Sequence, residues 1–284
     1  MTPHSPSILF RRSRPSAHLP ARLRHAVEDL KLDIANPSRG ANEEQVHKAV
    51  RKSLPEGEIP PDSFVGQIIA NNQSNFDAML NNQFCKDMAA ASTEEEKAKV
   101  LKGYKWYTVD FMYCENLMRY DAGRASNAPT IKDVLEGAQH VQSTYDFAQT
   151  ILKTCTDDLG IPEESVFAAK KSAAVTDYGS FEVDTAQDQD WFTSKIATIP
   201  CIQGYYQIAK MLQKTSVDKD TVWYKTWALE NMDWLYCESQ IKFFEANKPP
   251  VVLPEMEETW NRIFRTACGH EVDFFALGEN PQDL

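Results

Sequence analysis

Glycine and proline are scarce in this chain of 284 residues, which contains 11 glycines and 15 prolines. That scarcity excludes collagen-like and low-complexity chains and favours regular elements. No stretch approaches the ~18 consecutive apolar residues that cross a bilayer, so the sequence predicts no membrane-spanning segment. Positive charge is also in deficit, with 30 Lys and Arg against 41 Asp and Glu. A net charge of −11 would repel a polyanion, so we exclude nucleic-acid binding as well.

Closely spaced cysteines are absent. The six cysteines are spread evenly along the chain and form no CxxC pair. Such dispersal, without an apolar secretory leader, predicts free thiols in a reducing compartment rather than a disulfide framework. The same spacing argues against structural zinc.

Acidic residues are missing from the first 27 positions, which contain five arginines. An Arg-rich, acid-free start is typical of a mitochondrial transit peptide, although four prolines interrupt any long amphipathic helix there. We expect residues 1–60 to be a disordered or targeting extension, ending in the Pro-rich linker 55–61. Residues 61–284 should form the folded domain. The expected compartment is the cytoplasm, with the mitochondrion as the alternative.

Beyond residue 62, apolar residues recur at helical spacing, and strand-like alternation is scarce. Turn-forming breakers separate segments of ~10–25 residues. The pattern predicts a single all-α domain, a bundle of seven or eight helices. One helix should begin at the acidic run Glu94 to Glu96, capped by Ser92 or Thr93. The apolar stripes expected to face the core are Trp106, Asp110, Tyr113 and Leu117; Val134, Ala138, Val141, Tyr145 and Leu152; Trp223, Trp227, Asn231 and Trp234; and Trp260, Phe264, Ala267, Glu271, Phe274 and Phe275.

Two carboxylates, Asp110 and Glu271, lie on these apolar stripes. Burying an unpaired carboxylate is costly, so each is either satisfied by a backbone amide or an arginine, or it has a function.

The third candidate functional group, beside Asp110 and Glu271, is the thiol of Cys201 in the segment Ile199-Pro200-Cys201. We expect the proline to break or kink the helix and Cys201 to open the next turn, where the helix dipole lowers the pKa of a thiol and makes it nucleophilic. Tyr205, four residues later, should share its face.

Histidines offer little support for a metal or haem site. Glu136 and His140 are spaced to share a metal, but a helical di-iron site needs about six ligands, and residues 61–284 contain no second Glu/His pair of that spacing. Neighbouring His270 and Glu271 point ~100° apart on a helix. A haem would need an axial histidine such as His47, whose neighbours are polar. We therefore expect neither a metal nor any other cofactor.

Motifs beyond residue 100 resemble those of the TenA-type thiaminase II family, whose members are all-helical, have the haem-oxygenase-like fold and lack haem. The resemblance covers roughly residues 100–278 and includes a 23-residue separation between Tyr178 and Cys201. The other similar segments are WYTVDFMYCENLMRYDAGRA (106–125), GAQHVQSTYDFAQTIL (137–152), IPCIQGYYQIAKML (199–212), YKTWALENMDWLYCESQ (224–240) and IFRTACGHEVDFF (263–275).

Members of this family hydrolyse the exocyclic amine of 4-amino-5-aminomethyl-2-methylpyrimidine, a thiamine breakdown product, and many cleave thiamine. The resemblance implies that Cys201 is the nucleophile that adds to the pyrimidine ring. It implies that Glu271 is the general acid/base at a ring nitrogen and that Asp110 holds the amidine edge and helps to orient the thiol.

The resemblance also implies that Tyr178 stacks on the pyrimidine and that Tyr205 and Tyr113 complete the hydrogen-bonding wall. Two positions depart from the family pattern. Asn231 stands where the family has a tyrosine, which would enlarge the pocket unless this amide only packs within a helix. Val109 replaces the glutamine that usually precedes the catalytic aspartate.

Two other functions remain open at this stage: an enzyme of specialised metabolism with a larger substrate, and a non-catalytic ligand-binding or regulatory protein. The partner expected is a small heterocyclic substrate. Family members are commonly tetramers, so the resemblance implies a homo-oligomer. The aromatic residues that could serve either an interface or the core are Trp223, Trp234, Tyr236, Phe243 and Phe244.

Overall fold

A computed structural model of the chain describes residues 54–108 and 112–281. Every regular element in these two ranges is a helix, as expected for the all-α class. The α-helices are α3 (Phe64–Asn71), α4 (Gln73–Leu80), α5 (Gln83–Ala90), α6 (Glu94–Thr108), α7 (Tyr113–Ser126), α8 (Ile131–Lys153), α9 (Glu163–Ala168), α10 (Ala173–Asp188), α11 (Trp191–Ser194), α12 (Tyr205–Thr215), α13 (Trp234–Asn247) and α14 (Pro254–Glu279). Short π-helical or 3₁₀ segments are η2 (Thr154–Asp158), η3 (Lys195–Thr198), η4 (Pro200–Gly204), η5 (Tyr224–Ala228) and η6 (Glu230–Met232).

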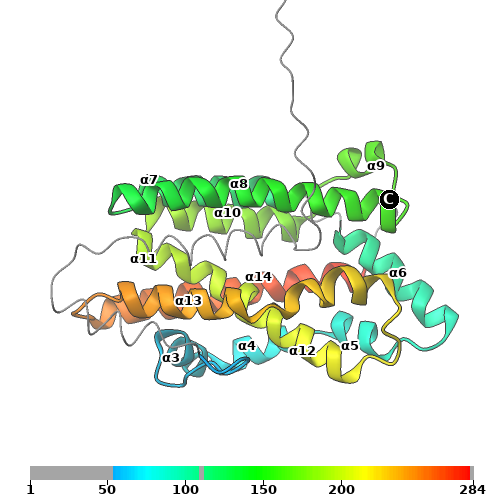
Figure 1. The fold of residues 1–284 in the computed structure, drawn as a ribbon, viewed down its shortest axis with the longest axis horizontal. Coiled ribbons are helices and arrows are strands. Elements are labelled where there is room, and N and C mark those ends of the chain that lie inside the picture. The colour runs from blue at the N-terminus through cyan, green and yellow to red at the C-terminus, as the bar shows by residue number, and fades with distance from the viewer. Residues whose placement is uncertain (1–53, 109–111, 282–284) are drawn as a thin grey trace, which may run out of the picture.

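Helix α14 is the centre of the bundle (Figure 1). It packs against α10 on one side, against α4 and α5 on the other, and against α6 along its C-terminal half. The predicted stripe from Trp260 to Phe275 is buried along its whole length, which confirms it as a core face. Seven α-helices in the described ranges have at least 11 residues, in line with the expected seven or eight, and the shorter ones add to them.

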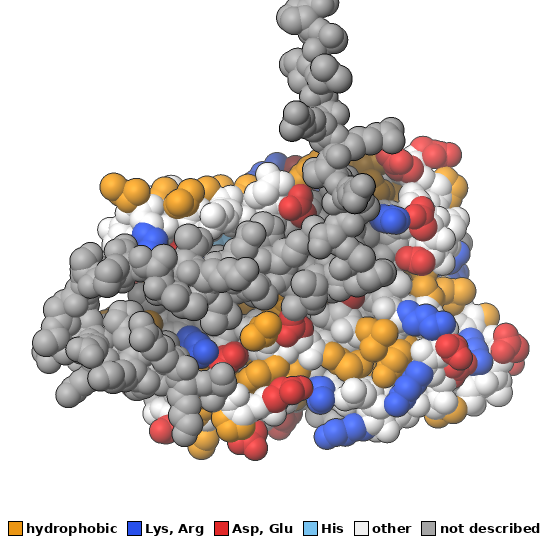
Figure 2. Space-filling view, in the orientation of Figure 1, with side chains coloured by type: hydrophobic (Ala, Val, Ile, Leu, Met, Phe, Trp, Pro, Cys, Tyr) orange, Lys and Arg blue, Asp and Glu red, His pale blue; other side chains and the backbone are white. Residues whose placement is uncertain are grey.

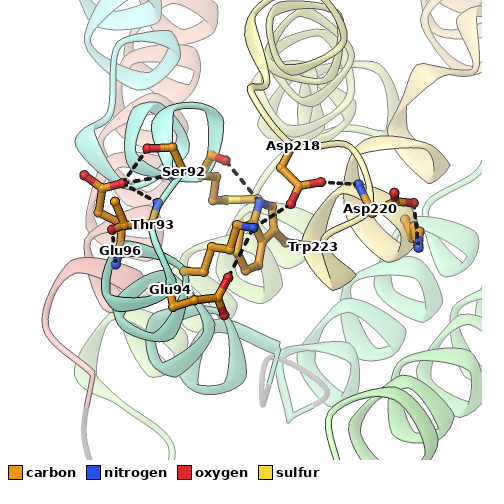
Figure 3. Close-up of polar contacts among 10 residues, drawn as sticks. Ser92, Thr93, Glu94, Glu96, Asp218, Asp220 and Trp223 are labelled. Atoms are coloured by element: carbon orange, nitrogen blue, oxygen red, sulfur yellow. Dashed lines mark hydrogen bonds and ion pairs between the residues drawn. The ribbon is translucent and has the colours of Figure 1, made fainter.

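Helix α6 begins at a reciprocal capping box (Figure 3). The Thr93 hydroxyl accepts the backbone N–H of Glu96 at 3.2 Å, and the Glu96 carboxylate accepts the backbone N–H of Thr93 at 3.0 Å. These hydrogen bonds satisfy N–H groups that a helix start leaves free, which confirms the predicted cap. Lys97 then joins the helix to Asp218 in the loop after α12, at 2.8 Å.

Two predicted stripes do not lie on one regular helix. Trp106 belongs to α6 and Tyr113 to α7. The segment expected to be one helix around Trp227 is divided into η5, η6 and α13. The division occurs because Asp233 leaves the helical conformation and its carboxylate accepts the N–H of Leu235 at 2.9 Å, so that α13 starts anew.

The prediction that the apolar stripe of helix α8 faces the core was wrong. Its stripe beginning at Val134 was expected to face the core, but Thr144 and Ala148 are the buried residues of this helix, and Val134 and Tyr145 are exposed. The reason is that α8 is an outer helix, which packs on α7 and continues into η2 (Figure 1). Helical periodicity identifies an apolar face but does not say what covers it.

Among the described residues, no helix combines the length and the apolar character needed to cross a membrane. All six cysteines lie within the described ranges and are free thiols. Cys201 is half-buried, whereas the other five are buried.

Candidate functional site

The carboxyl group of Glu271 lies in the interior of the bundle. Its side chain on α14 is fully buried, and the phenol of Tyr178 on α10 donates a hydrogen bond to Oε1 at 2.7 Å. Burial raises the pKa of Glu271 to about 7, because the charged form loses its hydration, and the phenols of Tyr178 and Tyr205 act in the opposite direction. The group can therefore gain or lose a proton near neutral pH.

The ring of Tyr178 is held on both sides by other rings. His270 stacks on it with the centroids 5.4 Å apart and the planes 9° from parallel. The Tyr113 ring lies 5.3 Å from it at 40°. Burial lowers the pKa of His270, which favours a neutral imidazole for this stacking. These contacts fix the phenol on Glu271, a role beyond the stacking that the resemblance implies.

A second buried carboxylate, Glu182, faces the same group of rings and was missed by the sequence analysis. It lies on α10, is fully buried and accepts a hydrogen bond from the Tyr113 hydroxyl at 2.5 Å. Glu182 follows Tyr178 by four residues, so the two share a helix face. That spacing was the available signal, and nearby Asp184 and Asp188 obscured it by making the segment look like a solvated acidic surface.

The thiol of Cys201 belongs to this cluster. Burial is the main reason that the pKa values of Tyr113 and Tyr178 are raised well above normal. Negative charge on Glu182, Glu271 or Cys201 raises both further, which places the three groups within electrostatic reach of both phenols. Side chains from α7, α10, η4 and α14 therefore lie within electrostatic reach of one another.

The backbone around Cys201 differs from the prediction. Pro200 does not break the helix: α11, η3, η4 and α12 follow one another, and Ile199 between η3 and η4 has helical dihedral angles of −64° and −46°. A π-helical turn accommodates the proline within this run. Cys201 is thus inside a helix and not at a helix start, so the predicted dipole effect on its thiol was wrong. Its Sγ donates to the Thr198 carbonyl at 3.2 Å.

Buried amides fix the turn that presents Cys201. Gln240 on α13 donates through Nε2 to the Thr198 carbonyl at 3.1 Å and to its hydroxyl at 3.2 Å. Its own Oε1 accepts from Gln203 Nε2 at 3.0 Å, and Gln203 also donates to the Cys237 carbonyl at 3.1 Å. The carbonyl that holds the thiol is therefore itself held from a different helix, which keeps the sulfur in one orientation.

Aromatic side chains form the wall on the other side of Glu271. Tyr205 packs against Trp227 and Phe275, with ring centroids 5.3 and 5.4 Å away, and accepts a hydrogen bond from the Tyr107 hydroxyl at 3.3 Å. Asn231 lies on the adjoining segment η6 and donates through Nδ2 to the Trp227 carbonyl at 2.8 Å. Its amide nitrogen is therefore engaged within its own helical segment.

Asp110 and Val109 lie outside the described residues, so the predicted role of Asp110 stays a prediction. Within the described ranges, no group of three or more His, Cys, Asp or Glu side chains is arranged to hold a metal ion. Of the predicted residues, Glu271, Tyr178, Tyr205 and Tyr113 are joined by hydrogen bonds and ring contacts. Cys201 lies within electrostatic reach of Tyr113 and Tyr178. Asn231 contacts Trp227, which packs on Tyr205.

The model of the TENA/THI-4/PQQC family matches residues 86–279 of this chain. A Schizosaccharomyces pombe protein with the provisional name hydroxymethylpyrimidine/phosphomethylpyrimidine kinase 2 is 26% identical over 132 residues. That match covers 46% of this chain but only 23% of the yeast protein.

Solved structures show the same fold. A TenA homologue from Pyrococcus horikoshii OT3 superposes with a TM-score of 0.64 at 15% identity, over 77% of this chain and 99% of the homologue. A structure titled as a TenA family transcription regulator, from Silicibacter sp. TM1040, gives 0.64 at 19% identity over 78% and 99%. A TenA-like protein of Sulfolobus solfataricus P2, provisionally named a thiaminase, gives 0.54 at 17% identity over 76% and 96%.

Proposed function

This chain belongs to the TENA/THI-4/PQQC family, and from that premise we propose that it is a cysteine-dependent hydrolase of thiamine-related aminopyrimidines. Its substrates would be 4-amino-5-aminomethyl-2-methylpyrimidine and thiamine, and its role thiamine salvage. The observation that carries the proposal is the buried Glu271, whose pKa is about 7. A cysteine, two phenols and a second carboxylate belong to the same electrostatic cluster. This set supplies a nucleophile and a proton donor without any cofactor.

The reaction would begin with transfer of the Cys201 thiol proton to the substrate's aminomethyl group and addition of the resulting thiolate to a ring carbon of the pyrimidine. A ring nitrogen takes up a proton from Glu271 as the ring loses its aromaticity. The electron-rich ring then expels ammonia from the aminomethyl carbon and leaves an exocyclic methylene. Water adds to that methylene, and the proton on the ring nitrogen returns to Glu271. The carbon–sulfur bond breaks, the sulfur takes up the proton lost by the water, and the hydroxymethyl product is released. With thiamine, the leaving group is the thiazole.

The burial of Glu271 suits this role. A general acid is most effective when its pKa is near the working pH, because much of it is then protonated and its proton is still acidic enough to be transferred. An exposed glutamate near its ordinary pKa would be ionised at pH 7 and could not donate. The hydrogen bond from Tyr178 stabilises the carboxylate that remains after the proton has been given up.

Glu182 would act through Tyr113. Its hydrogen bond fixes the Tyr113 hydroxyl beside the ring of Tyr178, so we assign Glu182 as a positioning residue for the aromatic wall. A buried carboxylate here also makes the site more favourable for a ligand that carries amino groups than for an anion.

The test is direct incubation of the purified full-length chain with the aminomethyl pyrimidine and, separately, with thiamine. Release of ammonia from the first compound and of the thiazole from the second would support the proposal. Absence of turnover with both compounds would remove the substrate assignment.

Asn231 favours a second candidate, an enzyme of specialised metabolism that acts on a larger substrate with the same thiol and acids. A phenol is missing at this position, and the amide nitrogen is engaged by the Trp227 carbonyl. Strong turnover of the pyrimidine would count against this alternative.

A non-catalytic binding protein is the third candidate. In such a protein, Cys201 should be alkylated no faster than the buried thiols under native conditions.

The compartment proposed is the reducing cytoplasm, in keeping with six free thiols, and a mitochondrial location is the alternative. Imaging of a C-terminal fluorescent fusion would distinguish the two.

A further inference from the structure

A second cavity, of about 50 Å³, lies apart from the cluster around Glu271. Its lining comes from α7, α8, α11, η3 and α13. In Figure 1, α11 and the C-terminal part of α13 lie at the same end of the bundle as the turn between α7 and α8. Arg124 in the cavity wall follows Tyr113 by 11 residues, about 16 Å along α7, so the cavity is separate from the proposed substrate site.

Charged side chains converge on this cavity. They differ from the charges around α6 and α12, where acidic and basic side chains are mixed over the surface (Figure 2). Dispersed surface charges are solvated, whereas charged groups that converge in a concave space are typical of a small-molecule site. The charged residues that line the cavity are Asp121, Arg124, Asp133, Glu136 and Lys195.

Arg124 is a buried cation. It is 5% exposed, and its Nε and Nη2 donate to the Ser194 hydroxyl at 3.1 Å and to the Trp191 carbonyl at 3.0 Å. The ring centres of Tyr120, Trp191 and Phe243 lie 5.8, 5.7 and 5.8 Å from its guanidinium carbon. Among the described residues, it forms no ion pair with a carboxylate. Because a guanidinium has further N–H donors and a buried cation without an anion is costly, this geometry favours an anionic ligand group.

Lys195 adds a second cation to the same part of the wall. Its Nζ lies 6.0 Å from the centre of the Phe243 ring, which Arg124 also contacts. Burial raises the pKa of Asp121, and the hydrogen bond from Thr144 and the charges of Lys195 and Arg124 act in the opposite direction. One carboxyl group that is itself costly to ionise does not neutralise two cations, so this part of the cavity suits a carboxylate.

Another part of the wall, contributed by α8, is acidic. Asp133 and Glu136 are three residues apart, so both lie on one face of this helix. Their carboxylates can accept hydrogen bonds from an ammonium group. A simple anion would meet these acids and a simple cation would meet Arg124, whereas a compact zwitterion is complementary to both parts of the wall.

We propose that this cavity binds a small α-amino acid, with its carboxylate on Arg124 and Lys195 and its ammonium group on Asp133 and Glu136. One water molecule needs about 10–15 Å³ of such a volume, so the cavity has room for about four or five non-hydrogen atoms, the size of glycine.

The test is the binding of radiolabelled glycine to the purified full-length chain, measured by equilibrium dialysis. One glycine should bind per chain with a Kd of about 1 mM, because a ligand of so few atoms makes few contacts. Acetate and methylamine each carry one of the two charges, and each should compete at least ~10-fold more weakly than unlabelled glycine. Cys201→Ser should bind glycine as the wild type does, since its thiol is not in the cavity wall.

Two variants test the two ends of the ligand. Lys195→Gln and Glu136→Gln should each raise the Kd about tenfold, because each removes one charged partner. Lys210→Gln is the matched control for the first, since its Nζ also lies 6.0 Å from a ring centre, that of Tyr206 on α12. Glu115→Gln is the control for the second, because it also loses an ion pair to a residue one helical turn later. Both controls should keep the Kd within about twofold of wild type.

The proposal would be overturned by the absence of binding at about 20 mM glycine, or by acetate or methylamine that competes as well as glycine. An unchanged Kd in Lys195→Gln or in Glu136→Gln would overturn it too, as would an equal rise of Kd in the matched controls. Circular dichroism confirms that each variant is folded.

Discussion

Replacing Glu271 by glutamine should stabilise the folded protein at alkaline pH. Glutamine has the shape of the protonated glutamate and can still accept the hydrogen bond from Tyr178, but it cannot ionise. The wild-type carboxyl has a pKa of about 7 in the folded state against an ordinary value of 4.5. Between these two values, the folded chain binds more protons than the unfolded chain, so the free energy of unfolding of the wild type falls as the pH rises.

The size of the effect follows from the shift. A difference of about 2.5 units corresponds to about 3 kcal/mol, and the group is fully buried, so solvent screening is small. The stability advantage of Glu271→Gln over wild type should therefore be about 3 kcal/mol larger at pH 8 than at pH 4.5. Most of that increase should occur between pH 5 and 7.

Urea unfolding followed by circular dichroism measures this difference at several pH values. Protein concentration is held fixed, because self-association would make the apparent stability depend on it. Glu95→Gln is the control: Glu95 is exposed in the first turn of α6, and its stability difference should stay within about 0.5 kcal/mol. A Glu271→Gln advantage that does not change with pH would refute the raised pKa and, with it, the proposed proton donor.

In the proposed mechanism Glu271 acts in its protonated form, so kcat/KM should fall as the pH rises above about 7. Tyr178→Phe should move this fall to a pH ~1 unit higher, because the charged form of Glu271 loses a hydrogen bond. An unmoved limb in the pH–rate profile would contradict that pairing. Glu182→Gln should preserve the fold and lower kcat about tenfold by loosening Tyr113, and a steady-state assay that finds wild-type kcat would exclude the positioning role. Gln240→Leu should lower kcat at least tenfold with little change in KM, since the carbonyl that orients the thiol loses its support; equal losses in a surface variant such as Val217→Lys would contradict the assignment.

The core of the fold could be predicted from the sequence because it depends on local periodicity. The stripe on α14 is dense in large apolar residues, and a helix with such a stripe must bury it. Glu271 was identifiable for the same reason, as a carboxylate placed among Phe264, Ala267 and Phe274. The cap at Thr93 depends on a spacing of three residues and was equally visible.

The features that escaped prediction depend on contacts between distant segments. The helix continues through Pro200 in a run supported by Gln240, 42 residues after Thr198, and no local pattern reports that contact. Glu182 resembles its acidic neighbours in sequence, and only its approach to Tyr113 distinguishes it. The stripe on α8 shows that an apolar face can be recognised from the sequence although its exposure cannot: Val134 and Tyr145 are exposed.

The central claim is that Cys201 attacks an aminopyrimidine inside this cluster. Ammonia release from 4-amino-5-aminomethyl-2-methylpyrimidine should be compared between wild type, Cys201→Ser and Cys237→Ser. Cys237 is the matched control, because its buried thiol donates to the carbonyl of Ile202 in the same helical segment. We predict at least a ~1,000-fold loss of kcat for Cys201→Ser and a change within about threefold for Cys237→Ser. Equal rates for wild type and Cys201→Ser would contradict the account.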